Sequence, residues 1–137
     1  QATVMLGGKS DPTFGAPIEI SGTVTKITNG TYVALGPRWK GVTHNMGPTA
    51  IIKSGGMEIV VVSNRLQLTE IEAFTHADID PSAHDVVIVK SMQHFRAAFQ
   101  PIAREVLICD AGALSSKDIA KLPFTKLRRP IFPIDLD

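Results

Sequence analysis

The first half of the chain alternates apolar and polar residues in the pattern of β-strands. Over residues 18–25, Ile18, Ile20 and Val24 alternate with polar neighbours, which is the period of a strand with one buried face. Asn29-Gly30 follows and predicts a hairpin turn, because both turn positions need residues that tolerate a positive φ. Further strands are predicted over residues 2–6, 31–35, 49–53 and 57–62, with a second hairpin at residues 54–56.

The second half changes period. Thr69 and Glu72 have the spacing of a capping box and predict a short helix ending near His76. Two aliphatic runs, residues 86–89 and 106–108, predict strands. Between them Ser91 can cap a helix whose apolar residues recur on one face: Met92, Phe95, Phe99 and Ile102.

These elements predict an α/β chain of mixed α+β character. N-terminal β-hairpins or a small barrel come first, and residues 57–110 then form a parallel β-α-β-α-β unit. The prolines after residue 122 favour an extended C-terminal tail. We expect one domain over residues 1–137, with a β-hairpin part at 1–67 and an α/β part with the tail at 57–137.

Composition narrows the classes of partner. The 137 residues carry a net charge of +1, so no global field recruits nucleic acid or an anionic membrane. The apolar runs are too short to span a bilayer. The four histidines and the one cysteine lack the spacing of a zinc site. We therefore expect a cytoplasmic protein with no nucleic-acid partner, no membrane and no metal site in this chain.

Lys90 and Ser91 are the strongest candidates for substrate binding. They directly follow the apolar run 86–89, and ligands of open α/β sheets bind beyond the carboxyl ends of the strands. A fixed positive charge and a hydroxyl at a helix start could hold a carboxylate or a carbonyl oxygen that develops negative charge. The alternative is that Ser91 only caps a helix and Lys90 is solvated.

Four further residues could join this substrate site. His94 could donate to a substrate oxygen or carry a proton, although a histidine at a helix start is more often structural. Arg96 offers a planar fork for a carboxylate or an ion pair within the domain. Asn64 and Arg65 follow the predicted strand 57–62 and would approach Lys90 if that sheet is parallel. No Ser/His/Asp triad can be asserted, so the catalytic residues remain unknown.

With these residues in view, the chain resembles the C-terminal region of the microcystinase C (MlrC) family of metallopeptidases. The matching segments are LGGKSDPTFGAPIEISGTV at residues 6–24, LGPRWKG at 35–41, MGPTAIIKSGGMEIVVVSNRLQ at 46–67, VVIVKSMQHFRAAFQPIAREVLICDAGAL at 86–114 and LPFTKLRRPIFPID at 122–135. They cover nearly the whole chain in the family's order.

The resemblance implies a zinc-dependent amide hydrolase whose zinc and zinc ligands belong to a large N-terminal domain. This chain would then shape and partly line the substrate cleft, with that N-terminal metal-binding domain and a peptide or small amide substrate as partners. The chain could also form a homo-oligomer. Because the sequence does not begin with Met, we expect a later part of a longer protein, or else a processed end. The alternative function is a non-catalytic module for small-molecule binding or assembly.

Overall fold

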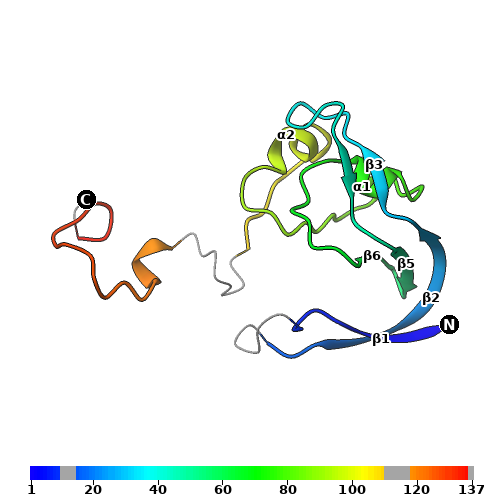
Figure 1. The fold of residues 1–137 in the computed structure, drawn as a ribbon, viewed down its shortest axis with the longest axis horizontal. Helices are drawn as coiled ribbons and strands as arrows, with labels where there is room; N and C mark the ends of the chain where they lie inside the picture. The colour runs from blue at the N-terminus through cyan, green and yellow to red at the C-terminus, as the bar shows by residue number, and fades with distance from the viewer. Residues whose placement is uncertain (10–14, 110–117, 136–137) are drawn as a thin grey trace. The chain divides into compact units, whose positions relative to one another are not determined.

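The β-patterned half of the chain forms two antiparallel sheets in the computed structural model, which describes residues 1–9, 15–109 and 118–135 (Figure 1). Four strands pair in the order β1-β2-β5-β6, and β3 pairs with β4. Their bounds are β1 Ala2–Leu6, β2 Ile18–Thr28, β3 Thr31–Val33, β4 Thr43–Asn45, β5 Thr49–Ser54 and β6 Met57–Val62. All of the predicted strands before residue 63 are therefore confirmed, and the structure adds β4.

Strand β2 is long enough to pair with two neighbours in succession. Its first part runs from Ile18 to Gly22 against β1, and its second part runs from Thr23 to Thr28 against β5. The register shifts between Val24 and Lys26, as in a β-bulge, which bends a strand and increases its twist. One alternating stretch of sequence thereby links β1 to the hairpin of β5 and β6.

The two predicted hairpins had different outcomes. The β5–β6 hairpin is confirmed, because Ser54 pairs with Met57 across a two-residue turn in which Gly55 has φ +57°. The prediction of a hairpin at Asn29-Gly30 is wrong. Only Gly30 adopts a positive φ there, and the Asn29 side chain instead accepts a bond from the Thr31 N–H. The chain therefore leaves the sheet, and β3 pairs with β4 rather than with β2.

The helices are shorter than the sequence predicts. They are α1 Glu72–Thr75, η2 Pro81–Ala83, α2 Arg96–Phe99, η3 Gln100–Ile102 and η4 Ile119–Lys121. The predicted capping box does not form, because α1 begins after Ile71 without a side-chain cap. Ser91 does not cap α2, which starts five residues later, and the chain continues into a 3-10 turn at Pro101.

Helix α1 and the segment after it pack beside both sheets. Tyr32 and Met46 pack with Ala73 of α1 in one buried cluster. Ile51 of β5 packs with Ala77 and Ile79 in a second cluster. Phe74 also meets Phe99 edge to face, with ring centroids 6.0 Å apart, so α2 is joined to α1. The core thus lies between the antiparallel strands and the short helices.

The predicted parallel β-α-β-α-β unit is not supported. Every strand pair in the described part of the chain is antiparallel. Residues 86–89 and 106–108 belong to no strand. An apolar run becomes a strand only where another strand offers its backbone groups, and the described chain offers none to these runs. The fold is mixed α and β, with antiparallel sheets and a few short helices.

Residues 1–106 and 107–137 form two compact units. In the second unit, the tail turns back on itself at residues 131–135, where the Ile131 N–H donates to the Asp135 carboxylate at 2.9 Å. Ser115 and Asp118 also have the spacing of a capping box, but Ser115 lies outside the described residues. No helix in the described ranges is long and apolar enough to cross a membrane.

Candidate functional site

The segment after β6 is held against the turn between β4 and β5. The backbone N–H groups of Ser63 and Asn64 both donate to the Met46 carbonyl, at 3.1 and 2.8 Å. The Asn64 side chain donates to the Asn45 carbonyl at 3.4 Å. Asn64, predicted to bind substrate, thus has a structural role on this turn, and Arg65 follows it on the surface.

Ser91 lies beside the continuation of that same segment. Gln67 Nε2 donates to Ser91 Oγ at 3.2 Å. The Ser91 oxygen is therefore an acceptor in this contact, and its own O–H stays available as a donor. Lys90 is exposed, and no hydrogen bond or ion pair links it to Asn64 or Arg65 among the residues described. The structure brings Gln67 close to Ser91 but does not join all the predicted site residues.

His94 contacts a residue that the sequence did not single out. Arg38 Nη1 and His94 Nδ1 lie 2.9 Å apart. A guanidinium can only donate, so Nδ1 accepts and the neutral ring carries its proton on Nε2. The Arg38 guanidinium also lies 5.2 Å from the Trp39 ring centroid. Arg38 therefore fixes the tautomer in which His94 can donate from Nε2.

The loop that carries Arg38 and Trp39 is closed by backbone bonds at its base. Ala34 N–H donates to the Val42 carbonyl at 2.9 Å, and Gly41 N–H donates to the Ala34 carbonyl at 2.8 Å. Gly41 has φ +82°, which a side chain would disfavour. A closed loop base limits the positions from which Arg38 can reach His94.

Arg96 interacts along its own turn of helix. Its Nε donates to the side-chain oxygen of Gln93 at 3.2 Å, and its Nη1 donates to that of Gln100 at 3.5 Å. The guanidinium also lies 5.6 Å from the Phe95 ring centroid. Arg96 is half-buried, and its present contacts lie along α2 and the residues that flank it.

A cluster of buried ionisable groups lies between the β3–β4 sheet and α1. Glu70 is 1% exposed, and no hydrogen bond of good geometry reaches its carboxylate oxygens in the described part of the chain, although the Gly36 backbone lies beside them. Glu72 Oε2 and His44 Nε2 are also buried atoms without a hydrogen-bond partner among the described residues. A Cβ on Gly36 would lie 1.9 Å from Glu70 Oε2, so a larger residue at position 36 would require the Glu70 side chain to move.

Burial shifts the acid–base properties of this cluster. It raises the pKa of the Glu70 carboxyl, and the nearby Glu72 charge raises it further. Burial also raises the pKa of Tyr32 to about 12, with additional contributions from Glu70 and Glu72. His44 stacks on Tyr32, with ring centroids 5.3 Å apart. Sequence reasoning missed Glu70, because an acid just before a helix is read as a first-turn residue facing solvent.

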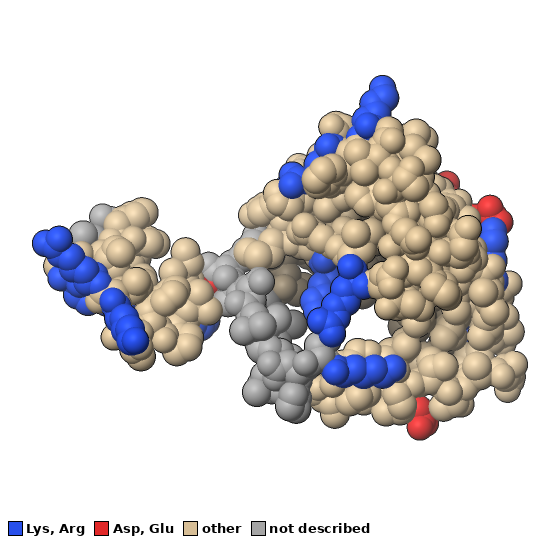
Figure 2. Space-filling view, viewed as in Figure 1, with Lys and Arg blue, Asp and Glu red and all other residues tan. Residues whose placement is uncertain are grey.

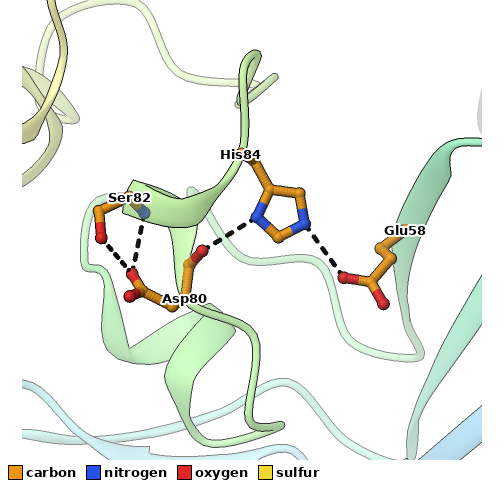
Figure 3. A network of polar contacts seen from close by, with 4 residues as sticks. All are labelled: Glu58, Asp80, Ser82 and His84. Atoms are coloured by element: carbon orange, nitrogen blue, oxygen red, sulfur yellow. Dashed lines mark hydrogen bonds and ion pairs between the residues drawn. The ribbon is translucent and has the colours of Figure 1, made fainter.

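A second polar network surrounds His84 at the surface (Figure 3). His84 Nδ1 lies 2.9 Å from the Asp80 carbonyl, and Nε2 lies 3.1 Å from the Glu58 carboxylate. Ser82 donates to the Asp80 carboxylate from its N–H and its hydroxyl, which lowers the pKa of Asp80. The Asp80 carbonyl and the Glu58 carboxylate raise the pKa of His84. The network ties the 3-10 turn η2 to strand β6.

The described residues do not supply a metal centre. No three His, Cys, Asp or Glu side chains among residues 1–9, 15–109 and 118–135 are arranged to hold a metal ion. A catalytic zinc needs three such protein ligands around one point. Figure 2 shows Lys and Arg side chains in several groups over one face, with few Asp and Glu among them.

Comparison with known proteins identifies relatives over almost the entire chain. The chain is 24% identical over 133 residues to Microcystinase C from Sphingomonas sp, a match that spans 97% of this chain and 25% of that protein. It also resembles the crystal structure of a protein from Mesorhizobium sp. BNC1 described as a "Putative metallopeptidase". The TM-score is 0.75 at 23% identity, over 99% of this chain and 27% of the other. This chain thus spans about a quarter of the length of each relative.

A family model agrees with these likenesses. The model described as MlrC C-terminus matches residues 1–126, which include every described strand and the helices α1 and α2. The resemblance seen in the sequence segments is therefore confirmed, and this chain belongs to the MlrC C-terminus family.

Proposed function

We propose that this chain is the C-terminal, substrate-facing domain of a peptidase or amide hydrolase of the microcystinase C type. The family match over residues 1–126 carries the proposal, because that family is defined by the C-terminal region of such proteins. In the proposal, zinc is held by an N-terminal domain of the longer protein, since the described residues offer no ligand set for it. That domain and a peptide or small amide substrate are the partners.

The substrate-binding chemistry is assigned to the surface around residues 90–96. Lys90 supplies a positive charge for a substrate carboxylate or a carbonyl oxygen. Ser91 donates its O–H while its oxygen accepts from Gln67. His94 donates from Nε2 while Nδ1 accepts from Arg38. Arg65 and Arg96 add donors for an anionic group, and Asn64 holds the neighbouring turn.

Replacement of Lys90 tests this assignment in the full-length protein. Lys90→Ala should lower kcat/KM by about 10–100-fold, the range for one lost charge-assisted hydrogen bond, while the zinc content stays unchanged. Lys90→Arg should keep part of the activity. Lys53→Ala is the matched control, because Lys53 is also exposed but lies on β5. Wild-type kcat/KM in Lys90→Ala would remove Lys90 from the site.

Metal analysis tests where the zinc lies. The 137-residue chain alone should hold no stoichiometric zinc after dialysis and should hydrolyse no peptide. One equivalent of tightly bound zinc that is lost on replacement of His94 would place the metal centre in this chain.

The genomic reading frame separates the proposal from a non-catalytic binding or assembly module. A frame that extends far upstream of Gln1 supports the hydrolase, and a frame that starts near Gln1 supports the module.

A further inference from the structure

Residues 86–89 form an apolar segment with no strand partner in the described part of the chain, although Val89 is half-buried. Val86 is 75% exposed, Ile88 is 89% exposed and Val87 is 36% exposed. None of the four residues belongs to a helix or strand. Among the described residues, the backbone hydrogen bond of this segment runs from the Ser91 N–H to the Val89 carbonyl at 3.2 Å, and so stays within the same stretch of chain.

Such a segment is costly in water. Single exposed apolar residues are ordinary on protein surfaces, but contiguous apolar runs mark sites of interaction. An unbroken run of β-branched residues is typical of a strand that is buried on both faces, as in a parallel sheet. Asp85 and Lys90 bound the run, so the apolar stretch has the length of one short strand.

We propose that residues 86–89 are a docking strand, which completes its backbone hydrogen bonds by pairing with a strand from the N-terminal part of the longer protein. This inference rests on the proposed function and names the surface through which the two parts meet. The partner segment is extended and apolar, because it must cover Ile88 and offer backbone N–H and C=O groups to this edge.

The lengths of the two relatives favour the N-terminal part of a longer protein as the partner of residues 86–89. Nearly all of this chain is matched, at 97% and 99%, yet the match spans only 25% and 27% of the two relatives. About three quarters of each relative is therefore further chain, which is ample to supply a covering strand. A second copy of this chain would instead cover residues 86–89 without any further sequence, and the experiments below distinguish the two.

Docking has a consequence for the substrate site. Lys90 and Ser91 follow the segment directly, so pairing of residues 86–89 would place both at the end of a fixed strand. Ser91 already accepts a hydrogen bond from Gln67 at 3.2 Å. The N-terminal part would then order the binding surface at the same time as it brings its metal.

Hydrogen exchange tests the pairing directly. In the 137-residue chain, the amides of residues 86–89 should exchange almost as fast as those of an unstructured peptide. In the full-length protein, their exchange should be slower by about a hundredfold or more. Fast exchange of these amides in the full-length protein would overturn the proposal.

A substitution tests the covering of the side chains. Ile88→Thr should leave the unfolding midpoint of the 137-residue chain unchanged and lower that of the full-length protein by about 5 °C. Ile27→Thr is the matched control, because Ile27 is 74% exposed but its backbone already pairs with Ala50. Equal effects of the two substitutions in the full-length protein would contradict a covered Ile88.

The remaining outcomes decide whether a second copy or the N-terminal part covers residues 86–89. A 137-residue chain that dimerises, with slow exchange at residues 86–89 and dissociation by Ile88→Thr, would replace the N-terminal partner with a second copy. Slow exchange in a full-length protein that hydrolyses no amide would keep the docking strand and overturn the hydrolase. Fast exchange at residues 86–89 in a full-length protein that hydrolyses amides would keep the hydrolase and overturn the docking strand.

Discussion

Strand β5 and the segment 86–89 both contain consecutive branched aliphatic residues, yet these residues have opposite environments. Ile51 and Ile52 of β5 are each 2% exposed and lie between two paired strands. Ile88 is 89% exposed and has no strand beside it among the described residues. Residue type alone does not explain the difference, because Ile51 and Ile52 of β5 are branched aliphatic residues like those of residues 86–89. The difference teaches that the neighbouring strand, and not the run itself, decides whether such a sequence becomes a strand.

The largest expected effect on stability comes from replacing a buried isoleucine of β5 by alanine, and the same replacement within residues 86–89 is its comparison. Ile51→Ala should lower the free energy of unfolding by about 4 kcal/mol, since it leaves a cavity in the core. Ile88→Ala in the 137-residue chain should change it by less than about 0.5 kcal/mol, because no packing is lost. Urea unfolding of the two variants measures both values. Similar losses would show that residues 86–89 are packed in the chain alone.

The next effect probes the turn that separates β2 from β3. Gly30 has φ +69°, and a Cβ there would lie 2.1 Å from the Gly47 carbonyl oxygen. Gly30→Ala should therefore lower the free energy of unfolding by about 3 kcal/mol, from backbone strain and overpacking together. Gly56→Ala is the control, because a Cβ on Gly56 would have no other atom of the described chain within 4 Å. A neutral Gly30→Ala would argue that this turn has another conformation.

A smaller effect concerns the buried Glu70 carboxyl and the dependence of stability on pH. Glu70 has a raised pKa in the folded state, so its contribution to stability is most favourable below its ordinary value of 4.5. Stability should fall as the pH rises through the raised pKa, because the buried carboxylate must then ionise. Glu70→Gln should remove this fall and raise the free energy of unfolding at neutral pH by about 1 kcal/mol. Unfolding curves of both proteins across the pH range measure the difference, and parallel pH profiles would contradict it.

The smallest effect concerns the exposed network that ties η2 to β6. Because the pKa of His84 is raised in the folded state, its stabilising contribution is complete below the ordinary value of 6.5 and is lost as the pH rises through the raised pKa. His84→Gln should flatten this part of the pH profile of the unfolding midpoint. Glu58→Gln should do so only in part, because the Asp80 carbonyl still accepts from His84. A profile unchanged by His84→Gln would remove the network from the stability of the fold.

The candidate site was only partly predictable for the same reason as the fold. Ser91 and His94 were predicted as site residues because they are polar residues next to an apolar run. Their partners Gln67 and Arg38 lie 24 and 56 residues away in the sequence, and no local pattern links them. Glu70 was missed because the sequence alone does not show that its carboxylate is buried.

The sequence by itself determined the local features of this protein. Its pattern of apolar, polar and turn residues indicated where most strands begin, the turn at Gly55 indicated one hairpin, and its ordered segments indicated the family. Only the tertiary structure decided that β2 pairs with β1 and β5 rather than with β3, that Glu70 is enclosed, and that residues 86–89 have no neighbouring strand in the part of the chain described. The physical reason is that alternation reports which residues prefer burial, while backbone pairing depends on which distant segment supplies the missing donors and acceptors.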